Sequence, residues 1–108
     1  MKVKTGIDLV DITEFSKSMQ NGGENFLHRV FLPSEITSLD PEHLAGLFAA
    51  KEAITKALSL GPGKWLEIEI THEESGRPIA KIGVPTKSQD LSISHTKTHA
   101  VAVFVAIL

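Results

Sequence analysis

Hydrophobic and polar positions alternate at the start of the chain, and this pattern predicts a β-strand over residues 2–12. Successive side chains of a strand point to opposite faces of the sheet. Val3, Ile7 and Leu9 therefore share one face, while Asp8 lies on the other face among apolar neighbours. A carboxylate in such surroundings is costly unless something compensates its charge, which makes Asp8 a candidate functional residue. On its own, Asp8 is also explained as a carboxylate near the end of a strand that faces solvent.

Short helical segments are predicted after this strand. Thr13 suits the N-cap of a helix over residues 13–19, and the sequence NGG at residues 21–23 then interrupts the chain. Another helical turn or two is predicted over residues 24–31. Pro33, in the sequence FLPSEI, suits the entry to a further helical segment.

The longest predicted helix begins at Asp40-Pro41 and runs to about Leu60. Asp40 suits its N-cap, and Pro41 suits its first helical position. Its apolar residues form a wide stripe, so we expect it to be covered on more than one side. Gly61 and Gly63 end the helix. A glycine loop of this kind can also let the backbone approach a phosphate, although it has no Walker pattern.

After this helix, the spacing of the hydrophobic residues changes from a helical period to alternation. Residues 66–72 alternate as a half-buried strand, and a hairpin turn at residues 74–76 leads to a second strand over residues 78–84. A third strand is predicted over residues 91–95, and residues 96–98 read as the tight turn that follows it.

The last segment is apolar at every position from Ala100 to Leu108. A strand of this kind needs cover on both faces, which a central place in the sheet or a second subunit can provide. Taken together, the elements predict a single domain over residues 1–108. Its fold class is α+β, with helices packed on a mainly antiparallel sheet.

Composition and charge narrow the class of protein. The chain has 108 residues, of which 42% are hydrophobic and 22% charged, as in an ordinary globular domain. It has no cysteine, which excludes a disulfide framework, a thiol nucleophile and thiolate metal sites. A net charge of −2 does not favour nucleic-acid binding. Neither a signal peptide nor a stretch of about 20 apolar residues is visible, so we expect a cytoplasmic protein that binds no membrane.

Two residues of the long helix have candidate chemistry. Glu52 and Lys56 are four positions apart and share a helix face, so on their own they are equally well explained as a solvated ion pair. If Glu52 meets Asp8 in the fold, the two carboxylates make half of a magnesium site, because Mg²⁺ is commonly held by one or two carboxylates together with substrate phosphates. Lys56 would then offer a point charge to a phosphate oxygen.

A third group of candidates is the sequence SISHT. Ser94, His95 and Thr96 place two hydroxyls and an imidazole at the mouth of a predicted turn, where Ser and Thr can also serve as local turn caps. His95 and His99 are four positions apart, a spacing that brings two imidazoles together only on a helix. In a strand-turn-strand segment they do not converge, so no zinc site is expected.

These segments, in this order, resemble the holo-acyl-carrier-protein synthases, which are small 4′-phosphopantetheinyl transferases. The matching sequences are GIDLVDI, HRVFLPSEI, LAGLFAAKEAITKAL, IEI followed by SGRP, and SISHTKTHAVAV, which cover nearly the whole chain. The resemblance implies a homotrimer with active sites at subunit interfaces. It also implies transfer of the 4′-phosphopantetheine arm of coenzyme A to a serine of an apo acyl carrier protein, with release of 3′,5′-ADP, a step in fatty acid biosynthesis.

By motif position, the resemblance implies roles for individual residues. Asp8 and Glu52 would bind Mg²⁺, and Lys56 would contact phosphate or assist proton transfer. The base that takes the serine proton is left open between a metal-bound water, a carboxylate and His95. The residues implied around coenzyme A are Lys56, Gly61, Gly63, Ser94, His95 and Thr96.

The chain also departs from the family pattern. Leu47 stands where the family usually has Arg, and Glu14 stands where an Arg tends to occur. These departures favour an alternative, a non-catalytic relative that binds coenzyme A or a partner protein. The joint presence of Asp8, Glu52 and Lys56 favours the enzyme. An unrelated magnesium-dependent phosphohydrolase would explain the two carboxylates but not the SISHT sequence.

Overall fold

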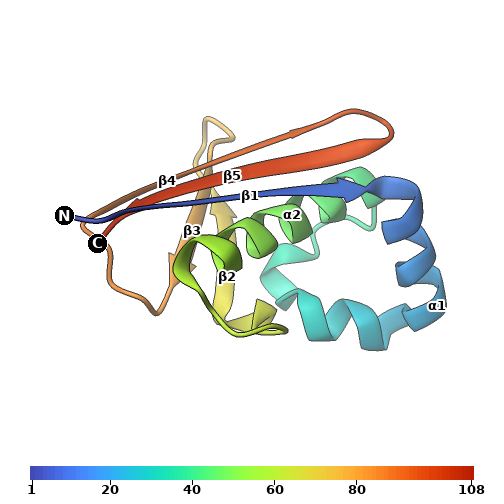
Figure 1. The fold of residues 1–108 in the computed structure, drawn as a ribbon. Helices are drawn as coiled ribbons and strands as arrows, with labels where there is room; N and C mark the ends of the chain where they lie inside the picture. Colours follow the sequence, from blue (N-terminus) through green and yellow to red (C-terminus); the bar gives the residue numbers. More distant parts are fainter.

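The structure is a computed structural model that describes the whole chain, and it confirms the α+β class. Three long antiparallel strands form one sheet in the order β1-β5-β4 (Figure 1). They are β1 (Val3–Asp11), β4 (Ser88–His95) and β5 (His99–Ile107). The shorter strands β2 (Ile68–His72) and β3 (Pro78–Ile82) pair only with each other. The strands therefore divide between two antiparallel sheets, where the sequence pattern suggested one.

Two helices complete the fold. Helix α2 (Pro41–Leu58) packs along one face of the three-stranded sheet, and α1 (Ile12–Val30) lies at the end of that sheet, beyond β1 (Figure 1). Two 3-10 turns, Pro33–Glu35 and Trp65–Glu67, flank α2 in the sequence. Neither helix combines the length and the apolar character that a membrane crossing requires.

The helix boundaries differ in two places from those predicted. Asp11, and not Thr13, caps α1, because its Oδ1 accepts a hydrogen bond from the Glu14 N–H at 3.0 Å. Helix α2 ends before the glycines predicted to stop it, since Ser59 already adopts the left-handed conformation with φ of 53°. The predicted interruption of α1 is present at Gly23, where φ is 55° and ψ is −142°.

Helix α2 packs closely on the sheet because small side chains meet between them. Alanines on the inner face of β5 are fully buried beneath the helix, as are those on the helix face that opposes them. At Gly6 of β1, an added Cβ would overlap the carbonyl oxygen of Ala53. Asp8 follows Gly6 by two residues on the same face, so this contact also brings Asp8 to the helix.

Gly6→Ala is therefore expected to lower the free energy of unfolding by about 3 kcal/mol, the upper end of the usual cost of overpacking. The added methyl group meets helix backbone, which cannot move aside as a flexible side chain can. Urea denaturation measures the change. Gly83→Ala is the matched control, because an added Cβ there meets nothing within 4 Å. Equal stability of the two variants would contradict the close contact.

The apolar strand β5 is central in its sheet, which is one of the two arrangements that its sequence left open, but a single chain covers only one of its faces. Its helix-facing residues are buried, while Val103 and Val105 on the other side are 39% and 36% exposed. Val3, Ile7 and Leu9 of β1 share this side of the sheet and are 62%, 59% and 66% exposed. We call these five residues the outer apolar face.

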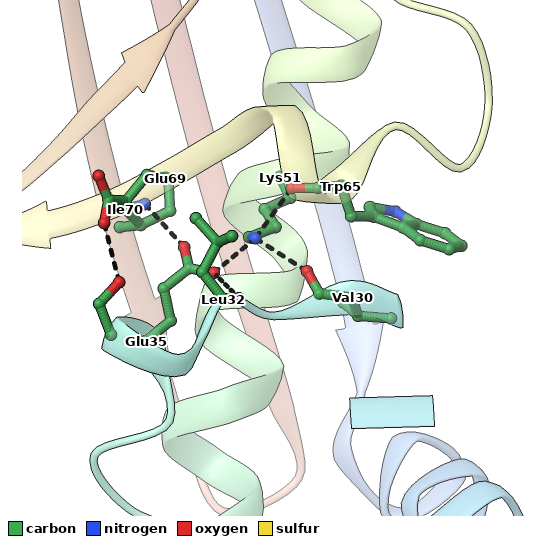
Figure 2. Close-up of polar contacts among 8 residues, drawn as sticks. Val30, Leu32, Glu35, Lys51, Trp65, Glu69 and Ile70 are labelled. Carbon is green, nitrogen blue, oxygen red and sulfur yellow. Dashed lines mark hydrogen bonds and ion pairs between the residues drawn. The ribbon is translucent and has the colours of Figure 1, made fainter. Parts of the chain in front are cut away.

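A buried ion pair joins α2 to the segments that flank it (Figure 2). The side chains of Lys51 and Glu35 are both 0% exposed, and Lys51 Nζ lies 2.6 Å from Glu35 Oε1. The ammonium also donates to the carbonyl oxygens of Val30 at 2.8 Å and Trp65 at 2.9 Å. All three N–H donors of the ammonium are therefore used, which is what allows a charge to be buried here.

Candidate active site

Asp8 and Glu52 come together in the fold, on the side of α2 that faces β1 and α1. Both line one hollow of about 350 Å³, which we call the carboxylate hollow. Its other lining residues include Asp11, Glu14 and Phe48. Asp8 reaches it from β1, where Gly6 permits the close approach, and Glu52 reaches it from the middle of α2.

The electrostatics of the hollow shows that the two carboxylates interact. Burial raises the pKa of Glu52 above its usual value, and the negative charge of Asp8 raises it further. The positive charge of Lys56 acts in the opposite direction and lowers this pKa. The pKa of Glu52 is raised overall, so ionisation of Glu52 in the folded protein is unfavourable. A bound cation would stabilise the ionised form.

Lys56 lies beside Asp8. Its Nζ donates to Asp8 Oδ1 at 3.0 Å and to the Ile7 carbonyl oxygen at 3.0 Å. The Lys56 side chain is 58% exposed, whereas that of Asp8 is 17% exposed. Lys56 therefore pairs with Asp8 and not with Glu52, so a simple ion pair along the helix does not describe it. Its exposed end can also reach a ligand phosphate from this position.

The donor set in the hollow fits Mg²⁺. Two carboxylates supply hard oxygen ligands, and nowhere in the chain do three His, Asp or Glu side chains gather in a way that could hold a metal ion. A centre with two protein ligands leaves the remaining positions of the octahedral shell to waters and substrate phosphates, which is the usual arrangement for Mg²⁺.

The SISHT residues lie elsewhere in the same chain. His95 ends β4, and its Nδ1 lies 3.4 Å from Glu42 Oε2 at the start of α2. It lines a different hollow, of about 230 Å³, together with Glu42 and Leu47. Thr96 caps the β4–β5 turn, since its Oγ1 accepts from the N–H groups of Thr98 and His99 at 3.2 and 3.1 Å.

The remaining predicted residues also stay apart from the carboxylates. Ser94 is exposed and is paired in register with Val101, which in turn is paired with Leu9 of the outer apolar face. Gly61 and Gly63 lie in the loop after α2, where Gly63 has a φ of 76°, and neither lines the carboxylate hollow. One chain thus unites Asp8, Glu52 and Lys56, but it separates them from the other residues predicted to lie around coenzyme A.

Comparison with known proteins decides the family. The family model of the 4′-phosphopantetheinyl transferase superfamily matches residues 4–105 of the chain. The chain belongs to this superfamily. Its predicted membership and its predicted fold class are both confirmed.

The similar proteins are holo-[acyl-carrier-protein] synthases. That of Thermoanaerobacter sp. (strain X514) is 35% identical over 99% of this chain and 88% of its own length. That of Thermodesulfovibrio yellowstonii is 40% identical over 93% of this chain and 94% of its own length. The Helicobacter pylori synthase, solved in complex with coenzyme A, is 34% identical, with a TM-score of 0.88 over 94% of this chain and 98% of that one.

Sequence reasoning did not single out Lys51, Glu35 or Trp65. Lys51 stands next to Glu52 in a segment that looks like an ordinary exposed Lys-Glu helix, and only the fold shows that it is buried. Trp65 is the only tryptophan of the chain, which was the one available signal, but nothing in its neighbourhood along the sequence points to its packing beside Phe48.

Proposed function

We propose that the protein transfers the 4′-phosphopantetheine arm of coenzyme A to a serine hydroxyl of an apo acyl carrier protein and releases 3′,5′-ADP. The observation that carries this proposal is the meeting of Asp8, Glu52 and Lys56 in a member of the phosphopantetheinyl transferase superfamily. Relatives over nearly the whole chain are holo-[acyl-carrier-protein] synthases, and the Helicobacter pylori and Bacillus anthracis structures contain coenzyme A. We expect the protein to act in the cytoplasm, where its carrier would be found.

The reaction forms a bond between the serine oxygen and the β-phosphorus of coenzyme A. The bond from that phosphorus to the 3′,5′-ADP oxygen breaks, and the departing oxygen keeps the electron pair. Lys56 is placed to neutralise charge on the phosphoryl oxygens, because its ammonium is anchored on Asp8 but remains exposed. Asp8 and Glu52 would hold Mg²⁺, which when bound supplies Lewis-acid stabilisation of the pyrophosphate. The serine proton leaves to a base that is a water or carboxylate in this hollow, or His95.

The alternative function, a non-catalytic relative that binds coenzyme A or a partner, is not favoured. A relative without activity has no need to hold two carboxylates and a lysine together in one hollow. Leu47 is 2% exposed and lines the hollow that contains His95. A leucine in place of Arg therefore removes a charge from that hollow. It does not change the carboxylate hollow, which Leu47 does not line.

Intact-mass spectrometry tests the function directly. A panel of apo acyl carrier proteins is incubated with the protein, coenzyme A and Mg²⁺, and a parallel set contains EDTA. A carrier that gains the mass of one phosphopantetheine arm, only when metal is present, supports the transferase. If no carrier gains mass although calorimetry shows coenzyme A binding, the non-catalytic alternative replaces it.

We also propose that the protein is a homotrimer whose active sites lie between subunits. The outer apolar face leaves Val3, Ile7 and Leu9 more than half exposed, and apolar surface of this kind usually marks an interface. The separation of His95 from Asp8 within one chain supports the same proposal, because a neighbouring subunit could bring its own turn residues to the carboxylate hollow. Light scattering at micromolar concentration is expected to report three protomers, and a monomer would contradict an interface site.

Charge reversal at Glu14 is expected to accelerate carrier modification. Glu14 is exposed on α1 at the edge of the carboxylate hollow, where its negative charge would repel an acidic carrier. Glu14→Arg should raise the rate about tenfold at low salt, because complementary charge increases the rate of encounter, and the gain should shrink as salt is added. Glu24→Arg, with the same charge change elsewhere on α1, serves as the control. Equal rates for both variants would place docking elsewhere.

A further inference from the structure

His95 is held through one of its two ring nitrogens. Its Nδ1 lies 3.4 Å from Glu42 Oε2 and 3.4 Å from the carbonyl oxygen of Thr96. The residue lines the hollow of about 230 Å³ that Glu42 and Leu47 also line, which we call the His95 hollow. Both contacts fix the imidazole from its Nδ1 side, so Nε2 is the ring nitrogen that is left for a ligand.

Both partners of Nδ1 are hydrogen-bond acceptors. A backbone carbonyl and an ionised carboxylate carry lone pairs and no proton, so Nδ1 can bond to either of them only as a donor. In a neutral imidazole, one nitrogen donates and the other accepts. The two contacts therefore favour the tautomer that has its proton on Nδ1, and this tautomer places the lone pair on Nε2.

The two acceptors are fixed by the backbone around them. Glu42 stands in the first turn of α2, where its N–H donates to Oδ1 of the Asp40 cap at 3.1 Å. The N–H of Thr96 donates to the carbonyl oxygen of His99 at 2.8 Å, which closes the turn between β4 and β5. The start of the helix and the turn meet at the end of β4, so His95 lies between two acceptors that are already in place.

The other groups around the His95 hollow favour a ligand that donates a hydrogen bond. Its titratable lining residues are Asp40, Glu42, His43, His72 and His95, and no lysine or arginine is among them. Leu47, which is buried in the lining, adds no charge. A phosphate at this point would meet two carboxylates and no permanent positive charge, whereas a hydroxyl group would meet acceptors.

We propose that Glu42 is a positioning residue for His95: together with the Thr96 carbonyl it holds the imidazole with Nδ1 as the donor, so that Nε2 accepts a hydrogen bond or a proton from a substrate hydroxyl. The orientation of His95 is a property of the free protein. Only the identity of the hydroxyl rests on the proposed transferase function, and it belongs either to the serine of the carrier or to coenzyme A.

NMR of the ¹⁵N-labelled native protein tests the orientation directly, because protonated and unprotonated ring nitrogens resonate far apart. At about pH 8, where imidazoles are ordinarily neutral, His95 is expected to carry its proton on Nδ1. Its signals are identified as those that His95→Gln lacks. A proton on Nε2 in the native protein would overturn the proposal, and this measurement needs no variant of Glu42.

Two substitutions of Glu42 separate its acceptor from its charge. Glu42→Ala is expected to shift the population toward the Nε2–H tautomer, and Glu42→Gln to restore the native tautomer in part, because the amide oxygen still accepts a hydrogen bond. Glu74→Ala, in an exposed turn that does not line the hollow, is the control. A population that Glu42→Ala leaves unchanged would overturn the proposal.

Transfer assays and calorimetry then identify the hydroxyl. The kcat/KM of transfer by Glu42→Ala is expected to fall about tenfold, a part of the roughly 100-fold or more that a positioned acid or base contributes, and Glu42→Gln should recover most of it. Unchanged affinity for coenzyme A points to the serine of the carrier, and affinity that falls with transfer points to coenzyme A. Native transfer by both variants would overturn the proposal. If even the native protein modifies no carrier, the proposed function fails, while the NMR result still decides where His95 carries its proton.

Discussion

Glu52→Gln is expected to reduce magnesium-dependent transfer by about 100–1,000-fold, as when a charge-stabilising group at a reacting centre is lost. The same substitution is expected to raise the thermal midpoint of the metal-free protein at neutral pH. Both effects come from removing the ionised carboxylate of Glu52. Transfer falls because this carboxylate would bind the metal, and the midpoint rises because burial and the charge of Asp8 disfavour its ionised form. Glutamine keeps the shape of the side chain, cannot ionise and is a poor ligand for Mg²⁺.

The pH dependence of this gain follows from the direction of the shift. The pKa of Glu52 is raised in the folded protein, so the native state binds its proton more tightly than the unfolded state does. The native protein therefore loses stability as pH rises through the folded-state pKa of Glu52. The advantage of Glu52→Gln should be present at pH 7 and should vanish as pH falls below about 4, where the carboxyl group becomes neutral in both states.

Thermal melts across this pH range measure the change in stability, and a mass-spectrometric time course measures the loss of transfer. Added Mg²⁺ should raise the midpoint of the native protein and not that of Glu52→Gln, because only a folded site that binds the ion is stabilised by it. Glu67→Gln is the control, since its side chain is 67% exposed and lies away from the hollow. Full transfer activity in Glu52→Gln would remove the metal assignment.

Lys51→Met is expected to lower the free energy of unfolding by about 3–5 kcal/mol, the usual cost of breaking a buried ion pair from one side. Glu35 would remain as a buried carboxylate without its cation, and the carbonyl oxygens of Val30 and Trp65 would lose their donor. Domains of this size are commonly stable by about 5–15 kcal/mol, so this single change could remove much of the margin.

Urea denaturation of single and double variants isolates the origin of the loss. Adding Glu35→Gln to Lys51→Met should recover part of the stability, because it removes the stranded charge and keeps an oxygen acceptor for the N–H groups of Leu32 or Ile70. Lys64→Met serves as the surface control. Lys64 is 52% exposed, and its Nζ lies 3.8 Å from Glu67 Oε2, so this pair is a surface ion pair of little expected worth. A loss below about 1 kcal/mol in Lys51→Met would show that solvent reaches the pair.

The elements of the fold could be predicted wherever the signal was local. Alternation identified β1 and β2, and an unbroken apolar run identified β5. Asp40-Pro41 placed the start of α2 correctly because a cap and its helix are adjacent in sequence. The N-cap of α1 was misplaced for the opposite reason. Asp11 and Thr13 are both good caps, and which of them is used depends on where β1 stops pairing with β5.

The sequence predicted which residues belong to the candidate site better than it predicted how they are arranged. The resemblance to the family pointed to Asp8, Glu52 and Lys56 as site residues. The fold places these three residues together. Their pairing was not predictable, because helix spacing suggested Glu52 with Lys56 whereas the fold joins Lys56 to Asp8. That choice depends on the close packing of β1 against α2.

The sequence by itself determined the α+β class, the order of the elements, the family and the residue types available for chemistry. These follow from periodicity, turn residues and motifs, which act over a few neighbouring positions. Only the tertiary structure decided that Glu52 meets Asp8, that Lys51 is buried with Glu35, and that Trp65 packs beside Phe48. Such contacts join segments distant along the chain, and they depend on how closely backbones approach at residues such as Gly6, a quantity that no local pattern encodes.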